Sequence, residues 1–298
     1  FTTGSLQIGE RGLLQRAQGP NDKGIDYITI SNQGHASTFG DMGTAAKYCT
    51  GVSNGVNGRG LFANGKADPT TGPIEYVTIS TLGAAADFGQ RTIDEDQGAA
   101  VSNGTNDRAV FAGGESATSV MDYVTISTPA NAANFGVIGT TGAYMGDGLD
   151  NGIDQRGIWA GNNPADDTIE FITISTLGDA VDFGNMTAAE YGMGMASNDT
   201  NDRGVIMGDG NSPYDGKIEY ITISTIGNAV SFGSLVESTG RAGGGLSNGT
   251  NDRAIFAGDY PSKNTIEYIT VSTPGDATAF GHMQGASQYP AGLSNSAK

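Results

Sequence analysis

The chain has 298 residues, of which 48 are glycine and only 16% are charged. Abundant glycine without a Gly-X-Y period excludes collagen, and the 37% hydrophobic fraction supplies too much apolar surface for a disordered chain. The formal net charge of −17 opposes a nucleic-acid partner or an anionic membrane, and no apolar run is long enough for membrane insertion.

Three landmarks recur six times along the chain. The first is an arginine, at Arg11, Arg59, Arg108, Arg156, Arg203 and Arg253. The second is an aromatic residue directly after an acid, at Asp26-Tyr27, Glu75-Tyr76, Asp122-Tyr123, Glu170-Phe171, Glu219-Tyr220 and Glu267-Tyr268. The third is a Phe-Gly pair twelve residues after each of these aromatics, at Phe39, Phe88, Phe135, Phe183, Phe232 and Phe280. A period of 47 to 49 residues indicates one structural unit copied along the chain.

Each unit is predicted to hold four short strands and almost no helix. In the last unit, the small residues 242–246 form the first strand, 247–252 a hairpin turn and 253–258 the second strand. The third strand alternates β-branched and other residues, as in 220–224, and a Gly or Pro turn leads to a fourth strand ending at Phe-Gly. Four strands in about 48 residues are typical of a β-propeller blade.

The repeats resemble kelch-type repeats. The match is a strand ending in Gly113-Gly114, then an aromatic-bearing strand, then an aromatic residue on the outer strand. Elsewhere the doublet is interrupted, as in Gly258-Asp259, and Phe stands where kelch repeats have an outer-strand Trp. The recurring Tyr-Ile-Thr-Ile-Ser-Thr and Asp-Phe-Gly sequences are similar to kelch-like repeats in structural, tail-associated proteins of marine tailed phages. This resemblance implies a virion protein.

The two ends of the chain complement each other. Residues 292–295 match the first-strand sequence 245–248, and Arg11 begins a second strand. We therefore expect an all-β, six-bladed, kelch-like β-propeller with four-stranded antiparallel blades, closed by pairing of the N- and C-terminal strands, which removes free edges. Residues 1–298 form one domain. Its blades 1 to 6 are predicted at 286–298 plus 1–45, 46–94, 95–141, 142–189, 190–238 and 239–285.

Landmarks that are the same in every blade are expected to serve the blade. The arginines and the acids begin neighbouring antiparallel strands, so they should lie toward opposite ends of the blade. We predict that both make structural hydrogen bonds and charge contacts to neighbouring loops. The six phenylalanines are predicted to be buried wedges between neighbouring blades, and Cys49 a buried small hydrophobic residue.

No motif predicts catalysis, a metal site or a cofactor. His35 and His282 occupy different positions in the repeat and lack further ligands at metal-binding spacing. No Ser-His-Asp arrangement is suggested and the Asp-box of sialidases is absent, so we expect no enzyme. Asn- and Asp-rich turns could bind calcium, but hairpin turns that bond their own backbone are favoured. The residues of these turns are Asp199, Asn201, Asp202, Asp209, Asn211 and Asp215.

The segments between the second and third strands differ most among the repeats. They cover 15–23, 64–73, 113–120, 161–168, 208–217 and 258–265, and the strand order places them on one face. Loops on a rigid scaffold often carry recognition, although solvated loops without a partner would look the same. The residues predicted for partner contact are Tyr214, Asp215, Tyr260, Lys263, Asp166, Asp167, Glu115 and Asp68. The two tyrosines are preferred because a ring offers a large apolar face at little rotamer cost.

These features predict a non-enzymatic structural or adhesion module of a virion, in a tail fibre or baseplate accessory. Its partners would be other virion proteins, or a glycan or protein of the host surface. The main alternative is a secreted bacterial carbohydrate-binding propeller. An intracellular kelch adaptor and a glycan hydrolase are less favoured.

Overall fold

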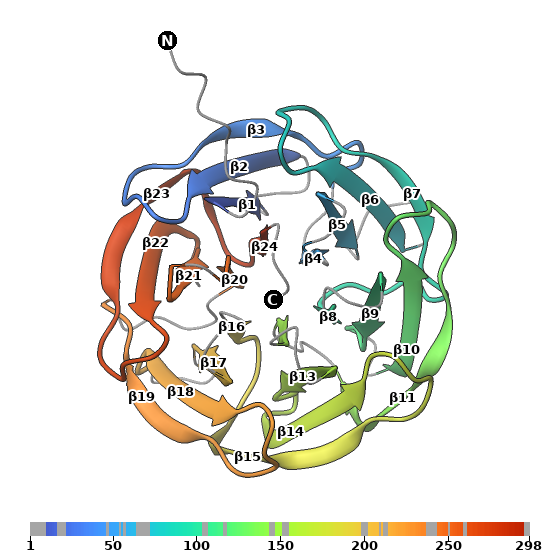
Figure 1. The fold of residues 1–298 in the computed structure, drawn as a ribbon, viewed down its shortest axis with the longest axis vertical. Helices are drawn as coiled ribbons and strands as arrows, with labels where there is room; N and C mark the ends of the chain where they lie inside the picture. Colours follow the sequence, from blue (N-terminus) through green and yellow to red (C-terminus); the bar gives the residue numbers. More distant parts are fainter. Residues whose placement is uncertain are drawn as a thin grey trace.

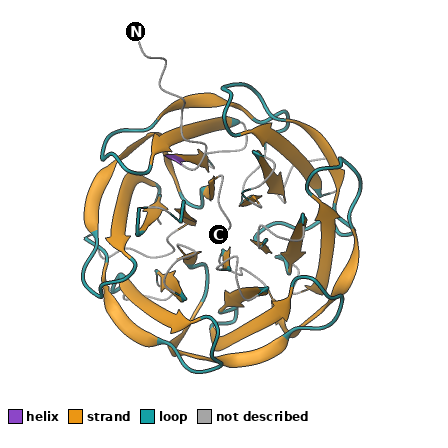
Figure 2. Ribbon diagram, in the orientation of Figure 1, coloured by secondary structure: helices purple, strands orange, loops and turns teal. Residues whose placement is uncertain are grey.

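The chain folds into six four-stranded antiparallel sheets arranged as a ring (Figure 1). The computed structural model describes residues 10–16, 22–45, 48–53, 55, 58–63, 72–102, 107–115, 118–142, 147–150, 155–197, 202–208, 210, 214–236, 243–249, 251–258 and 261–294. Strands joined by loops make up the blades throughout this part of the chain (Figure 2). The predicted all-β, six-bladed propeller is therefore confirmed.

The inner half of each blade holds the first two strands. The innermost strands are, from blade 1 to blade 6, β24 (Ala291–Ser294), β4 (Thr50–Ser53), β8 (Ala99–Val101), β12 (Gly148–Leu149), β16 (Gly194–Ser197) and β20 (Gly243–Ser247). The second strands each begin at a landmark arginine. They are β1 (Arg11–Gln15), β5 (Arg59–Ala63), β9 (Arg108–Ala112), β13 (Arg156–Ala160), β17 (Arg203–Met207) and β21 (Arg253–Ala257).

The outer half holds the third strand and the outermost strand. The third strands are β2 (Gly24–Thr29), β6 (Pro73–Thr78), β10 (Thr118–Thr125), β14 (Asp166–Thr173), β18 (Lys217–Thr222) and β22 (Lys263–Thr270). The outermost strands are β3 (Ser37–Asp41), β7 (Ala86–Gln90), β11 (Ala133–Gly142), β15 (Val181–Glu190), β19 (Val230–Ser234) and β23 (Thr278–Ser287). From the landmark acid onward, buried and less buried positions alternate along the third strands, which fits their alternating sequence.

Blade 1 is assembled from both ends of the chain. Its strand order is β24-β1-β2-β3, and Leu13 of β1 pairs with Leu293 of β24. Figure 1 shows the blue strand β1 beside the red strand β24. The predicted closure is confirmed, and β24 covers the inner edge that β1 would otherwise leave unpaired.

The hydrophobic core is divided among six seams, which are the contacts between consecutive blades and are named by the two blades. Each of the six buried apolar clusters combines residues of two neighbouring blades. At seam 3/4, for example, Phe135 and Ile138 of blade 3 lie in one cluster with Trp159 and Ile172 of blade 4. Because apolar burial is the main driving force of folding, neighbouring blades stabilise each other.

Each landmark phenylalanine occupies a β-bulge in the outermost strand. In blade 2, Ile74 pairs with Gly89 and Glu75 with Asp87, which leaves Phe88 as the extra residue. The same shift occurs in all six blades. A bulge redirects the side chain of its extra residue, and the six phenylalanines are only 0–5% exposed. The predicted wedges are confirmed, and the bulge accounts for the invariant spacing.

The glycine after each phenylalanine allows two backbones to touch. A Cβ on Gly40 would lie 2.0 Å from the carbonyl oxygen of Gly83, and one on Gly281 would lie 2.0 Å from that of Gly34. Any larger residue would push the blades apart. The Phe-Gly pair is thus a packing motif in which Phe fills the seam and Gly lets the next blade approach.

Candidate functional site

The six landmark arginines form a ring of contacts that joins the blades. Each guanidinium donates to the carbonyl directly after the third strand of the next blade, at 2.6–2.9 Å. Arg59 Nη1, for example, lies 2.7 Å from Ile126 O, and its guanidinium carbon lies 4.4 Å from the centroid of the Tyr76 ring. Each arginine therefore combines a charge-assisted hydrogen bond with a cation–π contact.

The six landmark acids form a second ring, at the other end of the blades. All six are at most 8% exposed. Each accepts a main-chain N–H from the residue four places after the phenylalanine of the preceding blade. Glu75 accepts from both Gly43 N and Thr44 N at 2.8 Å. These bonds offset the cost of burying a carboxylate. The structural interpretation of both rings is confirmed.

A third set of contacts joins each third-to-fourth-strand turn to the outer strand of the preceding blade. At seam 2/3, Asn131 Oδ1 accepts from Gln90 N at 3.1 Å. We call this contact the Asx clasp. The same contact is made at the next three seams by Asp179, Asn228 and Asp276. The equivalent residues at seams 6/1 and 1/2 are His35 and Ala84.

The residues predicted for partner contact are spread around the ring. Asp68 and Tyr260 lie outside the described residues. The other six belong to blades 3 to 6, on the face where the second strands end and the third strands begin (Figure 1). Asp215 is exposed and the others are half-buried, these being Glu115, Asp166, Asp167, Tyr214 and Lys263. These six residues therefore lie at several different points around the central axis of the ring.

Part of the predicted loop region is strand. β14 begins at Asp166 and β22 at Lys263, and both pair with ten-residue outer strands. Asp166 pairs with Glu190, and Lys263 with Ser287. The loop prediction is wrong for these segments because pairing to the long outer strand overrides a turn-like local composition. Asp166, Asp167 and Lys263 thus stand on fixed backbone.

The described acids of the candidate calcium turns are engaged by the backbone. Asp202 Oδ1 accepts from Ser224 N at 2.9 Å, and Asp215 Oδ1 accepts from Lys217 N at 3.0 Å. The other candidates, Asp199, Asn201, Asp209 and Asn211, lie outside the described residues. Asp215 therefore fits the favoured interpretation of a turn residue that bonds its own backbone, whereas Asp202 bonds the backbone of Ser224, 22 residues along the chain.

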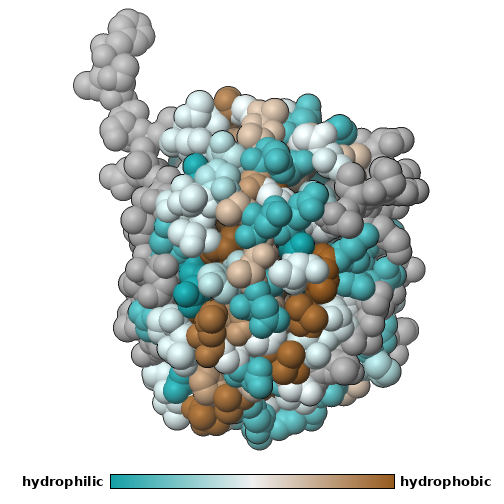
Figure 3. All heavy atoms as spheres, turned by 90° about the vertical axis from the view of Figure 1, so that its right-hand side faces the viewer, coloured by the Kyte–Doolittle hydropathy of each residue, from teal (hydrophilic) through white to brown (hydrophobic). Residues whose placement is uncertain are grey.

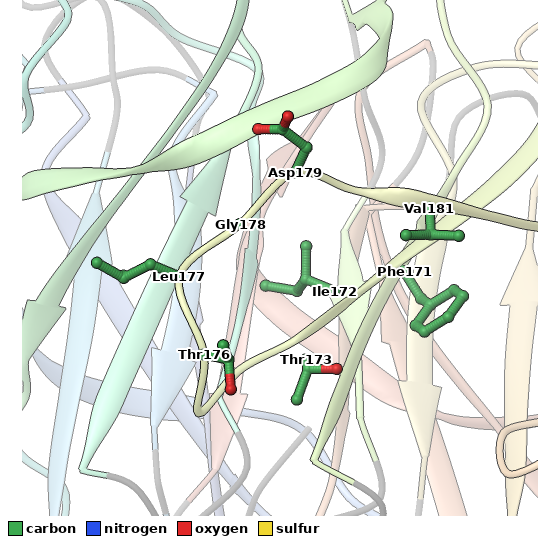
Figure 4. A pocket seen from close by; sticks show the side chains of 8 residues that line it. All are labelled: Phe171, Ile172, Thr173, Thr176, Leu177, Gly178, Asp179 and Val181. Carbon is green, nitrogen blue, oxygen red and sulfur yellow. The ribbon is translucent and has the colours of Figure 1, made fainter.

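A shallow hollow opens on the outer rim of blade 4. Its volume is about 250 Å³, and its lining includes Phe171, Leu177 and Val181 (Figure 4). In the described part of the chain, five of the seven exposed large apolar side chains belong to blades 4 and 5. Apolar side chains on the visible rim stand among polar ones and lie mostly in the lower half of the view (Figure 3). The described outer surface is thus most apolar at blades 4 and 5.

Cys49 lies partly buried at seam 1/2. Burial raises the pKa of its thiol well above the ordinary value, and the charges of Glu75 and Asp96 raise that pKa further. The thiol is therefore protonated at neutral pH, which agrees with a packing role.

The two histidines meet at seam 6/1. His35 lies in the turn before β3 and His282 in β23, and their stacked ring centroids are 5.3 Å apart. Their positions in the repeat do differ, as predicted. Spacing along the repeat could not reveal the pair, because the contact forms between the turn of one blade and the outer strand of another.

Among the described residues, no three His, Cys, Asp or Glu side chains come together as a metal site. The described chain also has no helix long and apolar enough to cross a membrane.

The architecture defines the class of the protein as a six-bladed β-propeller with four-stranded blades and polar contacts at every seam. No protein-family model matches the chain, and no curated protein is significantly similar to it. The kelch-like character therefore rests on the repeat pattern alone.

Proposed function

We propose that this propeller is a non-enzymatic structural and adhesion module of a virion, in a tail fibre or baseplate accessory. Its kelch-like ring would hold one loop-bearing face against a partner. That partner would be another virion protein, or a glycan or protein of the host surface. The observation that carries the proposal is the contrast between the uniform seams and this varied face.

The contacts that repeat at every seam hold neighbouring blades together, so they need no binding function to explain them. All six arginines make the same contact with the next blade, and all six acids make the same contact with the preceding one. The varied face differs from blade to blade, with Glu115 in blade 3, Asp166 and Asp167 in blade 4, and Tyr214 and Asp215 in blade 5. Variation on a rigid ring suits recognition, because the scaffold holds the varied residues in place.

The role in a virion is tested on purified particles and on attachment. Mass spectrometry of virions should find the chain as a component. Tyr214→Ala together with Tyr260→Ala should then lower attachment to host cells at least tenfold. Leu82→Ala is the matched control, because Leu82 is 53% exposed in a turn between third and fourth strands. Absence from virions, or equal attachment by the tyrosine variant and the control, would overturn the proposal.

The second candidate is a secreted carbohydrate-binding propeller. The observation that favours it is the combination of a half-buried Tyr214 with the exposed Asp215, since an aromatic face beside a carboxylate suits a sugar. A glycan array separates the two functions. Specific glycan binding by a chain that is absent from virions would favour the secreted lectin.

A further inference from the structure

Two tyrosines meet where the innermost strands of blades 1 and 2 begin. Tyr289 lies two residues before β24, and Tyr48 two residues before β4. Their ring centroids are 5.0 Å apart, with 68° between the ring planes, and both residues are half-buried. The innermost strands run antiparallel to the second strands, so they begin on the varied face, beside the axis (Figure 1). The pair therefore lies near the centre of the varied face, inside the loops predicted for partner contact.

The backbone of neighbouring blades holds both tyrosines in place. Tyr289 precedes Pro290, which restricts its backbone to extended conformations. Pro290 is itself buried against blade 6, since a Cβ on Gly243 would lie 2.7 Å from its Cδ. The carbonyl of Tyr48 accepts from Gln97 N of blade 3 at 3.2 Å. The two rings thus stand on backbone that contacts blades on either side.

Tyr48 has a backbone conformation that disfavours a large side chain. Its φ of 58° lies in the left-handed region, where a bulky residue is a rare and costly choice. Gly192, two residues before the innermost strand of blade 5, has a φ of 68° and adopts this region without steric cost. The fold therefore accepts glycine at this position. A tyrosine kept there against a backbone cost points to a use of its ring.

We propose that Tyr48 and Tyr289 bind a neutral pyranose unit of a glycan at the centre of the varied face. This inference rests on the adhesion role in the proposed function, and it names the chemistry of the partner. An edge-to-face pair uses only one of its four ring faces for its own contact. An aromatic face suits the apolar C–H face of a pyranose, while nearby polar groups bind its hydroxyls.

Polar groups beside the pair favour a neutral glycan over an acidic one. The side-chain Nε2 of Gln97 lies 3.4 Å from Oδ1 of Asp96, and Gln97 is the residue bonded to the carbonyl of Tyr48. The charges of Glu75 and Asp96 raise the pKa of the Cys49 thiol, in the residue directly after the first tyrosine. These carboxylates and the net charge of −17 repel sialic acids and other anionic sugars.

An array of neutral and sialylated glycans tests the inference on the full chain. The parent chain should bind neutral glycans. Tyr48→Gly should weaken this binding about tenfold or more, because the ring face is lost. Tyr289→Ala, which leaves the backbone at position 48 untouched, should weaken it by a similar factor. Tyr48→Phe keeps the ring face and should retain most of the binding.

A matched glycine variant separates loss of the ring from a change in the backbone. Tyr48→Gly relieves the left-handed conformation, which offsets the lost ring contact, so Tm should stay within about 4 °C of the parent value. Gln155→Gly makes the same relief on the opposite face, where φ is 59° and the equivalent residue of blade 2 is Gly58 with a φ of 60°. This control should bind glycans as the parent does.

Two results would overturn the inference. One is a parent chain that binds no neutral glycan on the array. The other is equal binding by Tyr48→Gly, Tyr289→Ala and the Gln155→Gly control. Both results are distinct from failure of the proposed virion role, because that role is measured by the protein composition of purified particles.

Discussion

Seams 2/3 and 3/4 each bury a landmark phenylalanine, but the buried carboxylates of the two seams have different interaction partners. At seam 3/4, Glu170 accepts a main-chain N–H at 2.8 Å, and the neighbouring position holds the buried Ile138. At seam 2/3, Arg91 stands in the place of Ile138. Its Nε lies 2.9 Å from Oδ1 of the shorter Asp122, whose Oδ2 accepts from Thr92 N at 2.7 Å.

The buried landmark acid is therefore held by an ion pair together with a main-chain N–H at seam 2/3, and by a main-chain N–H beside an apolar residue at seam 3/4. Both side chains of the Arg91–Asp122 pair are fully buried, and burial lowers the pKa of Arg91 while the charge of Asp122 opposes that change. Asp26, the other landmark aspartate, also has an arginine nearby, Arg16 at 3.6 Å. Burial raises the pKa of Asp26, although a backbone hydrogen bond and Arg16 oppose this shift. Both landmark aspartates thus lie near an arginine, which is Arg16 of the same blade for Asp26 and Arg91 of the preceding blade for Asp122.

The largest difference between the two seams is expected from removing the landmark acid, as in Asp122→Ala at seam 2/3. This change leaves the Arg91 guanidinium buried without its counter-charge, which typically costs about 3–5 kcal/mol of the free energy of unfolding. The matched change Glu170→Ala at seam 3/4 removes hydrogen bonds without leaving such a cation, and should cost about 1–3 kcal/mol. Urea denaturation measures both. Equal losses would contradict the distinction between the two seams.

The apolar halves of the two seams are expected to be equivalent. Phe88→Ala at seam 2/3 and Phe135→Ala at seam 3/4 should each cost about 3–5 kcal/mol, because both rings are at most 3% exposed and fill the same bulge. The same urea experiment reports both losses. A difference above about 2 kcal/mol would show that the apolar packing differs as well.

Exchanging the chemistry of one seam for that of the other is expected to have a smaller effect. The double variant Arg91→Ile with Asp122→Glu gives seam 2/3 the residue types of seam 3/4. It should leave stability unchanged or raise it by about 1–4 kcal/mol, because a buried ion pair seldom exceeds well-packed apolar residues. Each single variant serves as a control and should be less stable than the double variant. If the double variant is the least stable of the three, the ion pair contributes more than its desolvation costs.

The smallest effect is expected at the Asx clasps, which the two seams share. Asn131→Ala at seam 2/3 and Asp179→Ala at seam 3/4 should each cost about 0.5–1.5 kcal/mol, the net worth of one hydrogen bond. Both bonds lie at exposed positions. Thermal melting measures the change, and a loss as large as that of Phe88→Ala would show that the clasp has a role beyond this bond.

The number of blades and the closure could be predicted because each landmark lies within one blade. Arg59, for instance, marks the start of a second strand, and this can be recognised without knowing which residues of other blades it contacts. The contact of Arg91 with Asp122 could not be read from the repeat, because Arg91 replaces an apolar residue in one copy only. The histidine pair was missed for a similar reason, since its members belong to the first and last blades.

The varied face was harder to predict than the ring. The segment around Asp166 has the composition of a loop, yet its backbone pairs with Glu190 of a long outer strand. Local composition does not include that partner, which lies outside the segment. The identity of a binding partner is more distant still, because solvated loops and recognition loops share the same polar residues.

The three recurring side-chain contacts at the seams point one way around the ring, whereas main-chain hydrogen bonds such as that from Gly83 N to Phe39 O run the other way. In the arginine contact, the acid contact and the Asx clasp, the donor belongs to one blade and the acceptor to the next. For these side-chain contacts each blade has a donor flank and an acceptor flank, and two unlike flanks make a heterologous, head-to-tail interface. Such an interface can also join separate copies, at the cost of their translational freedom, and the assembly closes into a ring when the rotation per copy divides the full turn. A fragment of two or three consecutive blades should carry both flanks and form trimeric or dimeric rings. In the native chain, the covalent links keep the six blades in sequence and close together. The contacts between their flanks set the angle at which the ring closes.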